Sequence, residues 1–183
     1  MKLKLVFVIL CLSYNLFFCQ SKGKVIKVKD GDTVVVLLGN NKQETLRLAE
    51  VDCPENGQAF GKNAKQFTSS QIFGKTVVFY RMSKDRYRRT VAKIFYDDNK
   101  YLSAEIIKSG LGWWYFKASK SIVLKDYEIK AKNSKTGLWK DGNAISPWEF
   151  RKNNKKKKRG FVIYKTSFCG VGGIRTLVQT SNT

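Results

Sequence analysis

Residues 25–51 read VIKVKDGDTVVVLLGNNKQETLRLAEV, and their alternation of apolar runs with turn residues decides the fold. Val, Leu and Thr fill the runs, whereas Asp-Gly-Asp and Gly-Asn-Asn interrupt them, which is typical of short strands joined by tight turns. The three predicted strands cover residues 25–29, 33–38 and 44–51. Because the connections are short, we expect consecutive strands to pair antiparallel as a meander.

The third strand of this meander carries an arginine between two leucines. Side chains alternate between the two faces of a strand, so Leu46 and Leu48 share one face and Arg47 lies on the other. The two leucines are expected in the core. Arg47 is therefore presented away from them, where it is able to serve a polar site.

The elements that follow complete a small barrel. Phe60, Ala64 and Phe67 recur at helical spacing, and Ser103 is expected to cap a short helix that ends at Gly110. The remaining predicted elements are strands over 75–82 and 90–96 and a helix over 122–133 with apolar Val123, Tyr127 and Ala131. This order fits an α+β, mainly β class: a five-stranded Greek-key barrel of the oligonucleotide-binding (OB) type with three α-helices.

The charge balance favours a polyanionic partner. Lysine and arginine number 35 against 14 aspartate and glutamate residues, which gives a formal net charge of +21. A cationic surface attracts nucleic acid, and its binding to the phosphates releases their counterions. This attraction does not depend on base sequence. Two other interpretations stay open: the charge keeps an exported protein in solution, or it attaches the protein to anionic polymers of the cell envelope.

The chain contains no histidine. This excludes a Ser-His-Asp triad, a Cys-His nucleophile pair and a histidine-rich zinc site. Cys53 and Cys169 therefore lack the partner that makes a thiol a nucleophile, and two such distant cysteines are not expected to form a disulfide framework. Hydrolytic chemistry in this chain has to use carboxylates, arginines and a metal ion.

Residues 1–19 have the pattern of an export signal. Lys2 and Lys4 precede an apolar run that ends at Phe18, too short for a permanent membrane span and followed at once by polar residues. We therefore expect removal of this segment, no stable membrane insertion afterwards, and a secreted or periplasmic protein. Phe18 directly before Cys19 disfavours the alternative of a lipid-anchored envelope protein.

The composition changes again after Phe150. Residues 153–160 read NNKKKKRG, a basic tract of the kind that stays solvated. We expect one folded domain over residues 20–150, followed by a basic, disordered tail over 151–183.

Five charged residues, scattered along the chain, offer the parts for breaking a phosphodiester bond. They are Asp32, Arg47, Asp52, Glu55 and Arg89. Carboxylates supply oxygen ligands for a hard cation and a base for water, and arginines supply planar forks that match phosphate oxygens.

The motifs around these residues follow a specific order. They are DGDT (30–33), Arg47, VDCPE (51–55), DRYRRTVA (85–92), GLGWWY (110–115) and GLWKDGNAISPWE (137–149). Each motif alone is common, but in this order they resemble the thermonuclease family of the staphylococcal nuclease type. The resemblance covers residues 25–148 and implies the same OB-type barrel.

The resemblance implies a calcium site. Asp32, Asp52 and the backbone carbonyl of Cys53 take the positions of the family's protein ligands, and Ca²⁺ prefers such hard oxygen atoms together with several waters. The family usually has threonine where this chain has Cys53, and the swap should spare the metal because the contact is through the main chain. Asp30 either reaches the ion through water or only satisfies its own turn.

The resemblance also implies the reaction. Glu55 takes the place of the general base or water-orienting carboxylate, and Arg47 and Arg89 take the places of the arginines that grip the scissile phosphate. The implied reaction is in-line attack of water on phosphorus, which expels the 5′-oxygen and leaves 3′-phosphorylated products. The expected enzyme is a monomeric, sequence-nonspecific endonuclease of the micrococcal nuclease kind, acting on DNA and RNA that is single-stranded or frayed.

Three further residues are candidates for nucleic-acid binding. Tyr87 and Tyr115 are able to stack on a base of any identity, although such aromatic residues also belong to cores. Arg88 stands where the family commonly has glycine. It either strains a turn that needs a positive φ or adds a phosphate contact in a permissive turn.

Two other functions fit part of the sequence. A non-catalytic nucleic-acid-binding barrel would keep the fold and the charge, and a basic envelope protein would use calcium structurally. The presence of all five charged residues favours the enzyme.

Overall fold

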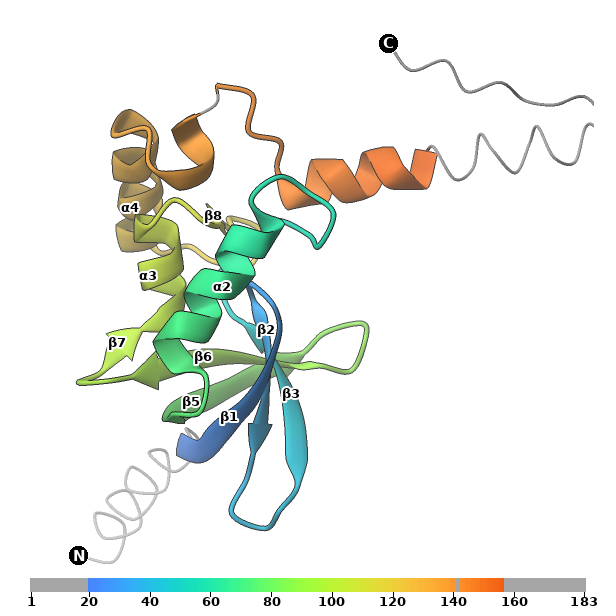
Figure 1. Cartoon of the computed structure of the whole chain (residues 1–183), viewed down its shortest axis with the longest axis vertical. Helices are drawn as coiled ribbons and strands as arrows, with labels where there is room; N and C mark the ends of the chain where they lie inside the picture. The colour runs from blue at the N-terminus through green and yellow to red at the C-terminus, as the bar shows by residue number, and fades with distance from the viewer. Residues whose placement is uncertain (1–19, 141, 157–183) are drawn as a thin grey trace, which may run out of the picture. The chain divides into compact units, whose positions relative to one another are not determined.

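The computed structural model of the chain describes residues 20–140 and 142–156 (Figure 1). It divides into two compact units, one ending at Pro147 and one beginning at Trp148. The predicted export signal, Cys169 and residues 157–183 of the predicted tail lie outside the described residues. No helix within the described ranges is both long enough and apolar enough to cross a membrane.

A closed barrel of five strands forms the first unit and confirms the predicted OB-type class. The strands are β1 (Gln20–Asp30), β2 (Thr33–Leu37), β3 (Gln43–Leu48), β5 (Thr76–Lys84) and β6 (Thr90–Tyr96). Antiparallel neighbours give the order β3-β2-β1-β5-β6, and β3 closes the barrel by pairing parallel with β6. Closure leaves no long free edge.

Three two-residue strands were not predicted from the sequence. They are β4 (Val51–Asp52), β7 (Lys100–Tyr101) and β8 (Trp113–Trp114). The predicted third strand was too long, because the chain bends after Leu48, with Glu50 at φ 67, and continues as β4, which pairs with β8. Two residues are too few to display a period, so tertiary pairing alone defines these strands.

Three α-helices and a short 3-10 turn accompany the barrel in the first unit. They are α2 (Gly61–Ile72), α3 (Leu102–Lys108), α4 (Ile122–Asn133) and η1 (Gly137–Lys140). Helix α2 packs against β1, and α3 packs against β6 and α4 (Figure 1). The three predicted α-helices are therefore present.

Two details of the predicted helices were wrong. Ser103 does not cap α3: Tyr101 holds the N-cap position, and the Ser103 hydroxyl lies inside the helix and donates to the Ala49 carbonyl at 2.8 Å. In α4, Val123 is exposed and Leu124 is buried in its place. The apolar repeat in α4 is too short to fix the buried face without knowledge of the packing.

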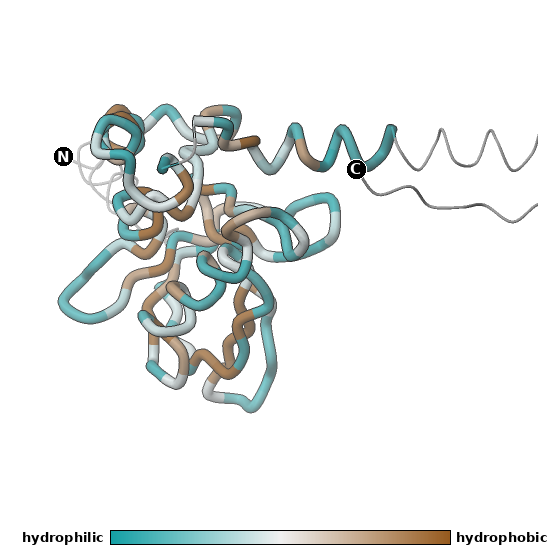
Figure 2. Tube along the Cα trace, turned by 45° about the horizontal axis from the view of Figure 1, so that its top comes forward, coloured by the Kyte–Doolittle hydropathy of each residue, from teal (hydrophilic) through white to brown (hydrophobic). Residues whose placement is uncertain are grey.

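The core fills the barrel and the space under the helices. Hydrophobic residues lie along the strands, whereas the turns between strands are hydrophilic (Figure 2). Fully buried members include Val34, Leu46, Leu48, Phe79, Ile94, Ile106 and Ile107. The predicted split in β3 is confirmed, because Leu46 and Leu48 are in this core and Arg47 is outside it.

The second unit is helical where it is described. Residues 147–156 form a helix that begins at the end of the first unit. Residues 151–156 therefore differ from the predicted disorder, and the boundary at Pro147 lies slightly before the predicted end of the domain. The composition of this tract predicted a solvated tail. Lysine and arginine also have high helix propensity, which accounts for the helix.

Candidate active site

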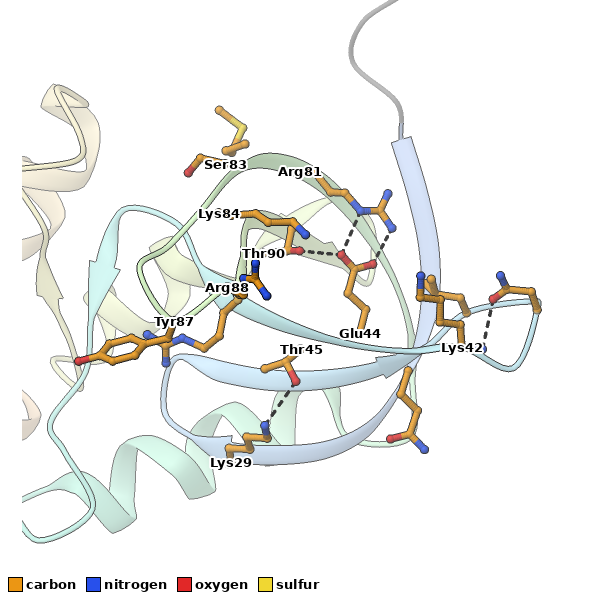
Figure 3. A pocket seen from close by; sticks show the side chains of 15 residues that line it. Lys29, Lys42, Glu44, Thr45, Arg81, Ser83, Lys84, Tyr87, Arg88 and Thr90 are labelled. Carbon is orange, nitrogen blue, oxygen red and sulfur yellow. Dashed lines mark hydrogen bonds and ion pairs between the residues drawn. The ribbon is translucent and has the colours of Figure 1, made fainter.

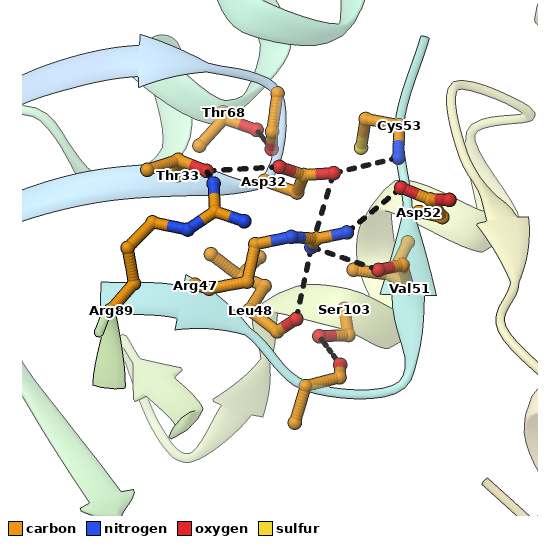
Figure 4. Close-up of polar contacts among 12 residues, drawn as sticks. Asp32, Thr33, Arg47, Leu48, Val51, Asp52, Cys53, Thr68, Arg89 and Ser103 are labelled. Atoms are coloured by element: carbon orange, nitrogen blue, oxygen red, sulfur yellow. Dashed lines mark hydrogen bonds and ion pairs between the residues drawn. The ribbon is translucent and has the colours of Figure 1, made fainter. Parts of the chain in front are cut away.

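Arg47 is the centre of a polar network beside the barrel wall (Figure 4). Its Nη1 donates to the carbonyls of Leu48 at 3.1 Å and Val51 at 3.0 Å, and it pairs with Asp32 Oδ2 at 3.1 Å. Its Nη2 donates to Asp52 Oδ1 at 2.8 Å. The bend after β3 folds the chain back so that these carbonyls reach the guanidinium. Arg47 is thereby held in one orientation.

The charge of Arg47 is secured by its neighbours. Burial works to lower the pKa of the guanidinium, but the carboxylates of Asp32 and Asp52 outweigh it and raise that pKa. The side chains of Asp32 and Asp52 are 10% and 2% exposed. Arg47 and these two carboxylates are therefore a largely desolvated cluster in which no member is without an opposite charge.

Asp32 is positioned by the turn between β1 and β2. Its Oδ1 accepts from Thr33 Oγ1 at 3.1 Å, and its Oδ2 accepts from the Cys53 backbone N–H at 2.8 Å. The turn is fastened to α2 because Thr68 Oγ1 donates to the Gly31 carbonyl at 2.6 Å. A Cβ on Gly31 would lie 2.8 Å from those of Ala64 and Cys53, so this close approach requires glycine.

Asp30, beside this cluster, has a carboxylate oxygen without a hydrogen-bond partner. Its Oδ1 is buried and accepts no hydrogen bond. Burial, followed by the charge of Asp32, raises the pKa of Asp30 to about 6. Asp30 thus adds an orphaned carboxylate oxygen beside the desolvated Asp32, and Arg47 also pairs with Asp52. Such carboxylate oxygens are the ligands that a hard cation prefers, so the residues present fit such an ion.

A cation at this place would keep much of its solvent shell. No three His, Cys, Asp or Glu side chains come together as a metal cage within the described ranges. Calcium takes 6–8 oxygen ligands and tolerates water among them. Asp32, Asp52 and backbone oxygen would therefore supply only part of its coordination, and water or phosphate would supply the rest.

Cys53 has no nucleophilic role in this geometry. Its thiol is free and buried, and burial, followed by the charge of Asp32, raises its pKa well above the usual range. A protonated, inaccessible thiol does not attack substrate. The hydrogen bond from its N–H to Asp32 places the backbone of Cys53 beside the carboxylate, in keeping with a main-chain role.

Glu55 lies in the loop between β4 and α2 and is half-buried. Its N–H donates to Gln58 Oε1 at 3.1 Å, and Gln58 Nε2 donates to the Ile145 carbonyl at 2.6 Å. The first residue of α2, Gly61, packs closely against this loop, since a Cβ on Gly61 would lie 2.2 Å from the Glu55 carbonyl oxygen. The position of Glu55 therefore depends on glycine at residue 61.

Arg89 reaches the cluster from the hairpin between β5 and β6. Its Nη1 donates to Thr33 Oγ1 at 3.2 Å, and Thr33 is in turn bonded to Asp32 (Figure 4). Its Nε donates to Asp85 Oδ2 at 2.7 Å. The structure thus brings together Asp32, Arg47, Asp52, Arg89 and the backbone of Cys53, with Glu55 three residues beyond Asp52.

Asp85 organises the hairpin and was not singled out in the sequence. Its Oδ1 accepts from the N–H groups of Tyr87 and Arg89, both at 2.9 Å. Burial works to raise the pKa of Asp85, but the hydrogen bonds from Arg89 outweigh it, and the pKa is lowered from its ordinary value. The available signal was its place four residues before Arg89 in a turn, where aspartate often bonds local backbone.

The three nucleic-acid-binding candidates differ in exposure. Tyr87 is 65% exposed and therefore not a core residue, whereas Tyr115 is half-buried and its N–H donates to the Glu50 carbonyl at 3.0 Å. Arg88 has φ 64, the left-handed region that favours glycine. Its position therefore does require a positive φ, and Arg88 adopts it while its side chain stays exposed.

Glu50 is a half-buried carboxylate beside the bend after β3 that the sequence did not reveal. It accepts from Tyr101 at 2.8 Å and Ser119 at 2.9 Å and pairs with Lys93 at 3.2 Å. Burial works to raise its pKa, but these donors lower it. This network anchors the bend between β3 and β4, and so it supports the segment that carries Asp52. Its members are too far apart in the chain for a local motif.

Comparison with known proteins assigns the chain to a family. The profile described as "Staphylococcal nuclease homologue" matches residues 45–141, more than half of the chain. The chain belongs to the staphylococcal nuclease family. It is therefore a nuclease acting on nucleic acid, as the order of its motifs predicted.

Curated relatives agree with this membership. A Haemophilus influenzae protein named as an uncharacterized endonuclease is 37% identical over 132 residues, which cover 72% of this chain and 74% of the relative. A Shigella flexneri protein named micrococcal nuclease is 34% identical over 145 residues, which cover 73% and 82%. The predicted phosphodiesterase activity is confirmed by this family membership.

Proposed function

We propose that this nuclease depends on calcium, cleaves DNA and RNA without sequence preference, and leaves 3′-phosphorylated products. The observation that carries the proposal is one connected network of cationic and anionic groups. Its members, in order of contact, are Arg89, Thr33, Asp32, Arg47 and Asp52. A phosphodiester needs both kinds of group, because its own charge must be neutralised while water attacks phosphorus.

The two arginines would bind the scissile phosphate. A guanidinium offers planar donors that match two phosphoryl oxygens, and it stabilises the charge that grows towards the transition state. Arg47 is fixed by carbonyl and carboxylate oxygens, and Arg89 by Asp85 and Thr33. Such fixed donors need little reorganisation during the reaction, which favours catalysis over mere binding.

The aspartates would hold the metal ion. Asp32, Asp52 and the Cys53 backbone carbonyl are the proposed ligands, with Asp30 acting through water. Bound calcium neutralises phosphate charge and positions phosphate and water. The proposal draws support from the desolvated carboxylates and from the orphaned oxygen of Asp30.

Glu55 would accept a proton from the attacking water or orient that water. General-base assistance is worth about 10²–10⁴ in rate. The chain has no histidine to take over this role. The carboxylate follows Pro54, close in sequence to the proposed ligands, so it suits the part of a base near the bound phosphate.

Export belongs to the same proposal. A protein with an export pattern over residues 1–19 and a net charge of +21 suits digestion of nucleic acid outside the cytoplasm, as a monomer after removal of that segment. Cell fractionation and N-terminal sequencing of the mature protein test the location, and light scattering tests the oligomeric state. A full-length cytoplasmic chain would contradict the location.

The metal dependence is tested with the mature protein on denatured DNA and on RNA. We expect cleavage with Ca²⁺ and none with a chelator that removes it. Product ends are then assayed with a phosphatase specific for 3′-phosphates. Undiminished cleavage in chelator would remove calcium from the proposal, and 5′-phosphorylated products would overturn the proposed direction of bond breaking.

The role of Glu55 is tested by Glu55→Gln. We expect the variant to retain its fold and calcium binding and to lose about 10²–10⁴ in rate. Glu105→Gln is the matched control, because Glu105 is a partly exposed carboxylate on α3 paired with Lys108. Comparable activity in both variants would exclude Glu55 from the mechanism.

A further inference from the structure

A groove lies beside the candidate active site, between the β2–β3 hairpin and the β5–β6 hairpin (Figure 3). Its volume is about 920 Å³, which is at the upper end for ligand pockets. Its walls come from β3 and β5 and from the turn that carries Tyr87 and Arg88. Residues of both hairpins line it, and it is open to solvent.

Six of the fifteen residues that line the groove are cations. They are Lys29, Lys42, Arg81, Lys84, Arg88 and Arg89. Glu44 is the acidic residue of the lining, and its carboxylate accepts from Arg81 Nε at 3.1 Å, Arg81 Nη2 at 2.6 Å and Thr90 Oγ1 at 2.7 Å. Arg81 neutralises Glu44, and Arg89 is paired with Asp85 outside the lining, so Lys29, Lys42, Lys84 and Arg88 give the groove a positive potential.

The groove is continuous with the polar network of the site. Arg89 belongs to both, because it lines the groove and donates to Thr33, which is bonded to Asp32. A phosphate held by Arg89 therefore stands at the entrance of the groove. A nucleic-acid strand that continues from that phosphate would lie along the cationic residues of the groove.

Two residues at the entrance suit a single strand. Tyr87 presents a largely exposed ring, and Arg86 and Arg89 lie 4.9 and 5.5 Å from its centroid. A base stacks on such a ring whatever its identity. Arg88 is kept in a left-handed conformation that glycine would adopt without strain. Its guanidinium lines the groove, so this strained residue contributes a cation to the lining.

We propose that this groove, with Lys29, Lys42 and Lys84 as its principal contacts, binds the phosphate backbone of the single strand that continues beyond the scissile bond. The inference deepens the proposed function and rests on it for the position of the scissile phosphate. Lysines on flexible stems act as point charges and need no fixed base geometry. Binding here is therefore electrostatic and independent of sequence.

The test is a triple variant, Lys29→Gln with Lys42→Gln and Lys84→Gln. The matched control carries the same loss of charge on other exposed lysines: Lys120→Gln, Lys125→Gln and Lys130→Gln. Fluorescence anisotropy in chelator measures affinity for a thymidylate strand of about twelve nucleotides, within the 4–16 that one OB barrel covers, and for a dinucleotide.

We expect the groove triple to weaken binding of the long strand about tenfold and the control triple less than threefold. The slope of log affinity against log salt should become shallower by about 2 in the groove triple, since each single-strand phosphate contact contributes roughly 0.7. The dinucleotide, too short to enter the groove, should change less than twofold. Equal losses in both triples, or an unchanged long-strand affinity, would overturn the groove.

Failure of the groove and failure of the proposed function give different results. If the unmodified protein cleaves with Ca²⁺ but the groove triple binds the long strand normally, only the groove is refuted. If binding depends on the three lysines but no cleavage occurs with Ca²⁺, only the proposed reaction is refuted.

Discussion

Two arginine–carboxylate pairs of this nuclease lie in opposite surroundings. Arg47 is 15% exposed and pairs with Asp32 and Asp52 in the network beside the barrel wall, whereas Arg81 is 38% exposed and pairs with Glu44 in the groove. The first pair cannot lose a member without leaving a buried charge uncompensated. The second exchanges its partner for water at little cost. The first suits precise placement of one phosphate, and the second suits adaptable contact with a flexible strand.

Removing each arginine in turn is the strongest test of this contrast. Arg47→Met should lower the free energy of unfolding by about 3 kcal/mol, because Asp32 and Asp52 lose their counter-charge. Arg81→Met should lower it by less than about 1 kcal/mol. Chemical denaturation measures both. Activity of Arg47→Met should also fall by about 10²–10³, the cost of one preorganised donor. Equal destabilisation by the two variants would contradict the contrast.

The rigid side of the comparison also includes the Glu55 loop. In Gly61→Ala the new Cβ would stand 2.2 Å from the Glu55 carbonyl oxygen, so the loop must shift. A displacement near 1 Å costs about 10²-fold in rate, and overpacking costs about 1–3 kcal/mol in stability.

Gly57→Ala is the control for this loop, since a Cβ there meets nothing within 4 Å. Steady-state hydrolysis of denatured DNA should therefore show a loss of 10-fold or more for Gly61→Ala, within the range set by misplacement, and little change for Gly57→Ala. A fully active Gly61→Ala variant would mean that the position of Glu55 is not critical.

The groove side should instead show a gain in stability when its strain is relieved. Arg88→Gly removes a left-handed non-glycine residue, worth about 1–2 kcal/mol, but adds freedom to the unfolded chain. We expect a net stabilisation of about 0.5 kcal/mol and a salt slope for strand binding shallower by about 0.7. Arg86→Gly, whose φ is not positive, should destabilise. Stabilisation by Arg86→Gly would refute this account of strain.

The smallest expected effect is the acid sensitivity of the exposed pair. The hydrogen bonds from Arg81 lower the pKa of Glu44, so its contribution to stability is complete above the ordinary pKa of a glutamate and is lost as pH falls through the lowered value. The difference in unfolding free energy between the unmodified protein and Glu44→Gln should therefore shrink below about pH 4.5. A difference that grows with acidity would reverse the sign and refute the pairing.

Much of the barrel was predictable because its signals are local. The turn residues at 30–32 and 39–41 separate runs of period two, and Leu46, Arg47 and Leu48 alternate as the strand requires. Helix α4 begins at Ile122 and ends at Asn133 as predicted, with Ser121 accepting from the Leu124 N–H at its start. Local capping and periodicity fix such elements without reference to the rest of the chain.

Other features were not predictable because they arise between distant segments. Ser103 was taken for a helix cap, but its hydroxyl serves the Ala49 carbonyl, 54 residues away in sequence. The fastening of Glu50 by Tyr101 and Ser119 spans 51 and 69 residues. No window of sequence contains both partners of such contacts, so local patterns misassign them or pass over them.

The sequence by itself determined the family, the barrel and the chemical inventory: carboxylates and arginines without histidine, in a specific order. Only the tertiary structure decided how Arg47 is shared between Asp32 and Asp52, and that Arg89 reaches Asp32 through Thr33. The physical reason is that the residue types fix which charges exist, whereas closure of β3 on β6 and the bend at Glu50 fix which of them meet.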